Sequence, residues 1–225
     1  MRTAVRAFLL ALAIGIAAPA SRTSALEVYG NTGLANQGGT FLSDYNALAQ
    51  GFTVGSTSWT LQSVDIGFIF GAIAPTSGQV TVALYDNASS NPGTQIGTFT
   101  NPTFVTGTAL YNFAGFTGST TLAANTQYWV VVTANATGPS NYQWTYSNPE
   151  ASPAGLNGSG FTYLGTRGRE IPLGNPTWIS LAAPEQNMRI TINAVPEPST
   201  YALGGVAALV LGAAARRKTL KTATA

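Results

Sequence analysis

Residues 59–70, WTLQSVDIGFIF, decide the fold class because apolar and polar side chains alternate along them. The apolar side chains keep one phase as far as Leu61 and take the opposite phase from Val64 onward. Alternation with a period of two is typical of a β-strand with one buried face. A β-bulge near Ser63 would return both halves to the same face, and we expect one there.

Similar short runs occur along the rest of residues 26–194, separated by Gly, Pro, Asn and Ser. The expected strands are residues 51–54, 59–70, 79–85, 95–100, 109–113, 128–133, 142–147, 161–164, 177–181 and 187–192. Asn-Pro pairs at 91–92, 101–102, 148–149 and 175–176 predict breaks between runs. Because no helical periodicity separates the runs, we predict an all-β fold, a β-sandwich of jelly-roll type.

The composition supports this fold class and excludes one class of partner. The chain is 45% hydrophobic and only 8% charged, with 25 Gly and 12 Pro, as expected for short strands joined by turns. The sequence pI is about 9.0, but the basic residues lie mostly at the two ends. Residues 26–194 hold three Arg against seven Asp and Glu, a net charge of −4. We therefore expect no nucleic-acid binding.

Several kinds of catalysis are excluded by residue types that are missing. The chain has no Cys and no His, and residues 26–194 have no Lys, so Ser-His, Cys-His and Ser-Lys mechanisms are unavailable. A glycosidase would need two paired carboxylates, and the sequence does not pair any. We expect no catalytic residues, no enzymatic activity and no cofactor. Asp44, Asp86 and Asn87 offer oxygen ligands for calcium, but no calcium-binding motif is present, so we assign no metal site.

The first 25 residues have the organisation of a signal peptide. Arg2 and Arg6 precede an apolar stretch at residues 7–18, with no acidic residue nearby. Signal peptidase could cut after Ala20 or after Ala25, and we prefer Ala25 because strand-like sequence begins at Leu26. The alternative, a permanent N-terminal anchor, is disfavoured because twelve helical residues span only about 18 Å of a hydrocarbon core of about 30 Å.

The C-terminal end has three parts in a fixed order. A proline-containing motif is followed by an uncharged stretch at residues 201–215 and a basic cluster. The motif is Val195, Pro196, Glu197, Pro198, Ser199 and Thr200, and the cluster is Arg216, Arg217 and Lys218. The apolar stretch is about 22 Å long as a helix, and the basic cluster should stay cytoplasmic by the positive-inside rule. We therefore predict a short transmembrane helix with a basic tail at residues 201–225.

This tail resembles the PEP-CTERM tails of exosortase substrates. The resemblance implies that signal peptidase and an exosortase process the chain, that the inner membrane holds it transiently, and that it ends at the cell surface or outside the cell. Residues 26–194 would then be the exported domain and residues 195–200 the sorting motif. The alternative is a permanent single-span anchor behind a proline linker.

The exported domain also resembles a known family. The segments AQGFTV at 49–54, VALYD at 82–86, NPGT at 91–94 and YWVVV at 128–132 are similar to the choice-of-anchor domains, most closely type R. These motifs consist of strand and turn chemistry, so the resemblance implies a fold more than a function. We expect a structural or interaction role in the exopolysaccharide layer or biofilm matrix.

Four aromatic residues offer an alternative function, a glycan-binding module. Tyr142, Trp144 and Tyr146 alternate and so share one strand face, where flat rings could stack on sugars of an extracellular polysaccharide; Trp178 is a second contact candidate. The competing interpretation is that this face is the sandwich core, where aromatic residues also belong.

Overall fold

The computed structural model describes residues 24–42, 46–70, 79–104, 112–134, 142–148, 151–170, 177–182 and 187–197. The expected signal peptide, apart from Ser24 and Ala25, and the expected apolar helix lie outside these residues. Within the described ranges no helix is long and apolar enough to cross a membrane.

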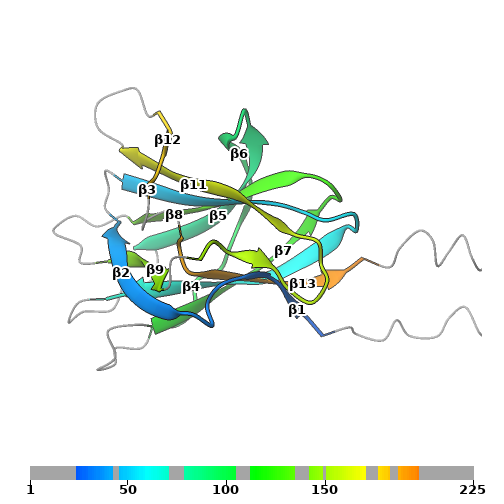
Figure 1. Ribbon diagram of the computed structural model, residues 1–225, viewed down its shortest axis with the longest axis horizontal. Helices are drawn as coiled ribbons and strands as arrows, with labels where there is room; N and C mark the ends of the chain where they lie inside the picture. Colours follow the sequence, from blue (N-terminus) through cyan, green and yellow to red (C-terminus); the bar gives the residue numbers. More distant parts are fainter. Residues whose placement is uncertain are drawn as a thin grey trace, which may run out of the picture.

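The described residues form strands packed as two antiparallel sheets (Figure 1). The strands are β1 (Leu26–Gly30), β2 (Ala35–Phe41), β3 (Asn46–Thr53), β4 (Trp59–Ile69), β5 (Val80–Ala88), β6 (Asn91–Thr98), β7 (Asn112–Leu122), β8 (Gln127–Ala134), β9 (Gln143–Asn148), β10 (Ala154–Gly155), β11 (Thr162–Glu170), β12 (Ile179–Ser180) and β13 (Ile190–Pro196). One sheet has the order β10-β1-β13-β4-β9-β2, with β7 also paired to β4. The other has the order β12-β11-β3-β8-β5-β6. The prediction of an all-β sandwich is confirmed at this level.

Strand β4 lies at the centre of the first sheet and contains the expected bulge. It pairs with β13 along one edge and with β7 along the other, while β9 joins its C-terminal end. Both long ladders shift register between Leu61 and Ser63. The irregularity returns Leu61 and Val64 to the same buried face, and both are fully enclosed.

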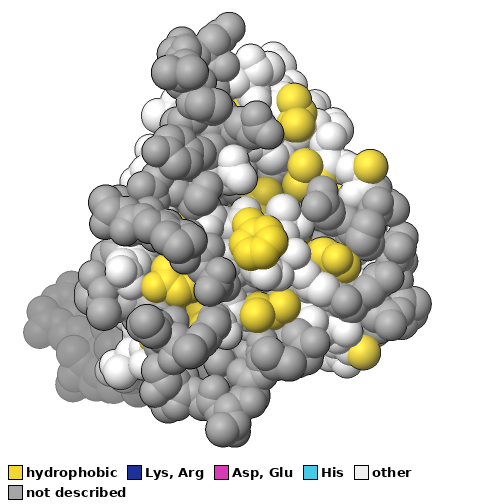
Figure 2. Space-filling view, turned by 90° about the vertical axis from the view of Figure 1, so that its left-hand side faces the viewer, with side chains coloured by type: hydrophobic (Ala, Val, Ile, Leu, Met, Phe, Trp, Pro, Cys, Tyr) yellow, Lys and Arg dark blue, Asp and Glu magenta, His cyan; other side chains and the backbone are white. Residues whose placement is uncertain are grey.

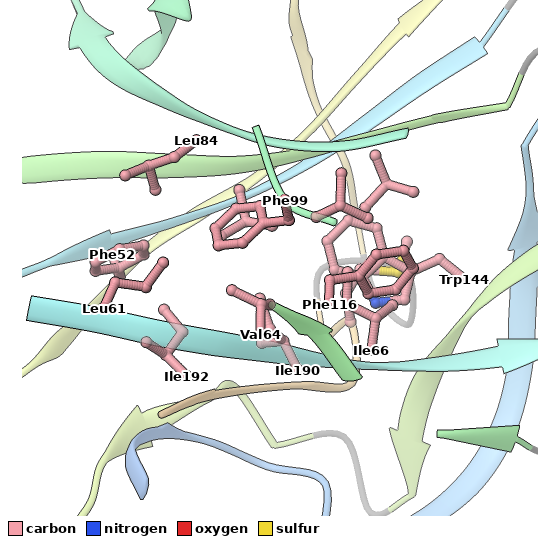
Figure 3. Packing of buried hydrophobic residues seen from close by; sticks show 14 of the residues in the cluster. Phe52, Leu61, Val64, Ile66, Leu84, Phe99, Phe116, Trp144, Ile190 and Ile192 are labelled. Carbon is pink, nitrogen blue, oxygen red and sulfur yellow. The ribbon is translucent and has the colours of Figure 1, made fainter. Parts of the chain in front are cut away.

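The main core lies between the sheets. Figure 3 shows Phe52 and Leu84 of the β3-β8-β5 layer facing Leu61, Val64 and their neighbours on β4, β7 and β13. Each fully buried aliphatic or aromatic side chain of this kind contributes about 1.5–3 kcal/mol by leaving water. The period-two pattern that predicted the strands is therefore the pattern that fills the core.

A second, smaller cluster lies on the outer face of the other sheet. In β8, Tyr128 and Val130 belong to the main core, so Trp129 between them points the opposite way. Trp129 packs with Ala47, Ala49 and Val131, and with the partly buried Tyr85, Leu164 and Trp178. Trp129 is fully buried although it lies outside the sandwich. We call this group the outer cluster.

One predicted break is wrong. The Asn91-Pro92 pair begins strand β6, where Asn91 pairs with Ala88 and Pro92 with Asn87. The chain turns instead at Ser89 and Ser90, which both have positive φ (51° and 63°). Two positive φ values in a two-residue loop match the twist of a β-hairpin, so the turn lies just before the pair that was expected to mark it.

We predict that Gly51→Ala destabilises the domain through the outer cluster. A Cβ at this position would lie 2.8–2.9 Å from atoms of the Trp129 ring, so the ring or strand β3 must shift. Overpacking of this kind costs about 1–3 kcal/mol. Urea unfolding measures the loss in free energy of unfolding. Gly33→Ala is the matched control, because nothing lies within 4 Å of its added Cβ, and its stability should stay close to that of the parent. Equal stability of the two variants would contradict the prediction.

Candidate functional site

The sorting motif begins inside the folded sheet. Strand β13 continues past Ala194, and its last two residues, Val195 and Pro196, pair with Thr60 and Trp59 of β4. Glu197 extends the contact, since its N–H donates to the carbonyl oxygen of Ser58 (3.0 Å). The folded part of the chain therefore runs beyond the expected boundary at Ala194 and includes the first half of the motif.

The side chain of Glu197 is also held by the domain. Thr60 Oγ1 donates a hydrogen bond to a Glu197 carboxylate oxygen at 3.3 Å. Thr60 and Glu197 are 137 positions apart in the chain, and both side chains are partly buried. The remaining motif residues, Pro198, Ser199 and Thr200, and the basic cluster lie outside the described residues.

Two of the four aromatic candidates are core residues. Trp144 has no exposed surface and Tyr142 only 7%, and Figure 3 shows Trp144 among the residues of the main core. The Trp144 Nε1–H donates to the carbonyl oxygen of Arg189 (2.9 Å), and the Tyr142 hydroxyl donates to Gln79 Oε1 (2.9 Å). Enclosed rings cannot stack on a sugar, so the glycan-binding hypothesis is wrong for these two residues and the core interpretation holds.

Tyr146 and Trp178 are partly buried and have protein partners. The Tyr146 ring lies over Gly38 of the paired strand β2. Trp178 packs against the outer cluster, with the Arg169 guanidinium 4.8 Å from its ring centroid. Arg169 belongs to strand β11, so this contact joins Trp178 to the edge of the second sheet.

The arginines of β11 clamp the outer cluster. Arg167 and Arg169 are two residues apart, so they point to the same sheet face. The Arg167 guanidinium lies 5.3 Å from the Trp129 ring centroid, and the Trp129 Nε1–H donates to Asn87 Oδ1 at 2.9 Å. Each cation–π contact contributes about 0.5–2 kcal/mol. The sequence analysis did not select Trp129 as a site residue. The alternation in Arg167-Gly168-Arg169 was a signal that the two arginine side chains share one face of their strand, the face on which Trp129 lies.

Two carboxylates of the domain, Asp86 and Asp65, form hydrogen bonds that stabilise local structure. Asp86 Oδ1 accepts a hydrogen bond from the Thr94 N–H (2.5 Å) across the β5–β6 hairpin. Asp65, on the outer face of β4, accepts one from Asn193 Nδ2 at 2.7 Å. No group of three or more acidic, His or Cys side chains within the described ranges is arranged to hold a metal ion.

Burial changes the acidity of Asp65. Partial burial raises the pKa of this carboxyl above its ordinary value of 3.8, because loss of water disfavours the charged form. The hydrogen bond from Asn193 acts in the opposite direction, and the negative charge of Glu27 raises the pKa further. Ionised Asp65 therefore costs the folded state some stability.

We predict that Asp65→Asn raises the free energy of unfolding at neutral pH. A carboxyl with a raised folded pKa destabilises the fold when it is ionised, and protonation removes the cost as the pH falls through the folded pKa toward 3.8. The amide resembles the neutral acid, so the gain in free energy of unfolding should shrink as the pH falls from the folded pKa toward 3.8, and vanish below 3.8. Urea unfolding of both proteins from pH 7 to pH 3 measures the difference. A variant that is less stable than the parent at pH 7 would contradict this sign.

Comparison with known proteins identifies the motif in the C-terminal tail. Residues 194–218 match the PEP-CTERM protein-sorting motif. No curated protein matches the chain. The matched segment includes Val195–Glu197 on the folded sheet and the basic cluster at 216–218. This motif indicates an exported protein that is anchored transiently in a membrane and processed by an exosortase.

Proposed function

We propose that the chain is an exported β-sandwich domain that an exosortase delivers to the cell surface, where it acts as a structural or interaction component of the exopolysaccharide layer. The observation that carries this proposal is the sorting motif at 194–218, whose first three residues are the last three of strand β13. Residues 1–25 support it independently, because their organisation is typical of a signal peptide that signal peptidase removes.

The arrangement of the two end strands suits a domain held between two membrane-directed segments. Strands β1 and β13 are antiparallel neighbours, with Leu26 at the start of one paired to Ala194 near the end of the other. The chain thus enters and leaves the domain at the same end of the sandwich (Figure 1). A short apolar helix after the motif, with its basic cluster in the cytoplasm, would leave the whole sandwich on the outer side of the membrane.

The chemistry of the domain supports a non-enzymatic role. Residues 26–194 lack His, Cys and Lys, so the common nucleophile–base pairs cannot be built. Figure 2 shows one end of the sandwich. The described side chains that are visible in this view are apolar or uncharged polar, and none of these is Lys, Arg, Asp or Glu. We propose that the apolar side chains among these described residues contact the matrix polymer.

Strand pairing supports the jelly-roll interpretation of the domain. A jelly roll is a long antiparallel hairpin rolled up, so early strands pair with late ones in nested order. Four nested pairs of this kind are present: β1 with β13, β3 with β8, β4 with β7, and β5 with β6. They lie in two sheets as β1-β13-β4-β7 and β3-β8-β5-β6. Strands β2, β9, β10, β11 and β12 lie outside these four pairs and extend the edges of the two sheets.

We predict that the double variant Pro196→Ala/Pro198→Ala is exported but accumulates uncut in the inner membrane with its domain outside. The two prolines restrict the backbone around Glu197 to an extended shape, and alanine removes that restriction. Membrane fractionation followed by mass spectrometry of the C-terminus measures the outcome.

Pro102→Ala is the control for that experiment. It makes the same substitution after β6, away from the tail, and should be processed at the parent rate. Unchanged processing of the double variant would remove the exosortase from the proposal and leave a short permanent anchor behind a proline linker.

A further inference from the structure

The first half of the sorting motif has one backbone edge already occupied. Val195 and Pro196 pair with β4, and the Glu197 N–H is bonded to Ser58. On the opposite edge, the described pairing with β1 ends at Ala194. The segment is therefore fixed on one side by the sheet and lies beyond the last β1 pair on the other.

The position of Pro196 is compatible with this place in the sheet. Proline has no N–H to donate, so it is tolerated where a strand has a free edge and not in the middle of a ladder. Pro196 lies at the last pair with β4, next to Trp59, and past the end of the β1 pairing. The motif can thus serve as the end of a strand without leaving an unsatisfied donor.

We propose that the domain acts as a clasp for Val195–Glu197 and confines the cut of the sorting enzyme to bonds on the C-terminal side of Glu197. This inference rests on the proposed function. The clasp consists of Ser58, Trp59 and Thr60 at the start of β4. An enzyme that binds its substrate as an extended strand pairs with the backbone groups of the peptide, and between Val195 and Glu197 those groups are partly taken by β4.

The cut itself breaks one backbone C–N bond. A nucleophile of the enzyme adds to the carbonyl carbon, the new amine of the tail leaves with a proton, and the acyl group passes to water or to an acceptor hydroxyl or amine that gives up its own proton. Reaching a carbonyl on the N-terminal side of Glu197 would require the end of β13 to separate from β4. Cutting after Glu197 leaves the strand whole.

The hydrogen bond from the Thr60 hydroxyl lowers the population of molecules in which the motif is undocked from the clasp. An enzyme that binds the Glu197 carboxylate must first break its hydrogen bond with Thr60. Binding then requires the undocked form, so the apparent affinity scales with its population. Thr60 is therefore a positioning residue for processing: it slows the reaction by holding the motif on the domain.

The C-terminus of the mature protein tests the position of the cut. The full chain is produced in a cell that contains the exosortase, and intact mass spectrometry identifies the last residue of the processed form. We expect the mature protein to end at Glu197 or later. A mature protein that ends at Pro196 or earlier overturns the clasp, because the cut then lies within the docked segment. A protein that still ends at Ala225 overturns the proposed processing itself, so the two failures are distinguishable.

Thr60→Val tests the clasp by its rate. Valine keeps the β-branched shape and removes the hydroxyl, so processing in pulse-chase should speed up roughly 2- to 10-fold, the factor that corresponds to one net hydrogen bond. The amide of Glu197 should also exchange faster with deuterium in the full-length protein. Thr60→Ser keeps the hydroxyl and should restore the parent rate.

Thr121→Val is the matched control. Thr121 lies on β7 directly across from Thr60, on the side of β4 away from β13, so its substitution should leave both readouts unchanged. Faster exchange at Glu197 without faster processing would overturn the proposal. Equal acceleration by Thr60→Val and Thr121→Val would overturn it too, since the cause would then be general loosening of the sheet.

Discussion

The pairing of β4 with β13 is the contact on which the rest of the molecule depends. Seven successive residues from Ile190 to Pro196 pair with β4, and this ladder joins the last strand of the domain to its first long hydrophobic strand. The same strand carries β7 on its other edge and buries Leu61, Val64 and Ile66 against the opposite sheet. Because β13 also holds β1, the ladder fixes both ends of the domain at one end of the sandwich.

The bulge in β4 shows how a local irregularity serves this ladder. Without the extra residue between Leu61 and Ser63, one half of the strand would turn its apolar side chains to the solvent. Both neighbouring strands shift register at the same place, so the ladder accommodates the bulge on both edges. The result is a continuous apolar face of eleven residues' length, ending close to the point where the sorting motif docks.

The outer cluster stabilises the second sheet from outside. Small residues on β3, Ala47, Ala49 and Gly51, leave room for the Trp129 ring, and the arginines of β11 cover the two tryptophans. These contacts link the side chains of β11 to Trp129 of β8 across the outer face of the sheet to which both strands belong. The two faces of β8 therefore perform different tasks, one in the main core and one in the outer cluster, and this explains why YWVVV has no polar residue.

Local patterns determined much of this protein from its sequence alone. Alternation in residues 59–70 determined strand β4 and its bulge, and the Pro-Glu-Pro tail determined the sorting motif, because both depend on neighbouring residues only. Strand β2 was not predicted, and β7 was predicted only in part. Each lies near an edge of its sheet and is rich in Gly, Asn and Thr, with too few apolar residues to show a period of two.

Contacts between residues that are far apart in the sequence decided the rest of the structure. Alternation placed Tyr142 and Trp144 on one face, but only packing against Phe70 and Arg189 made that face the core. Likewise, no local signal could show that Glu197 is held by Thr60, because the two residues meet only when β13 completes the sheet.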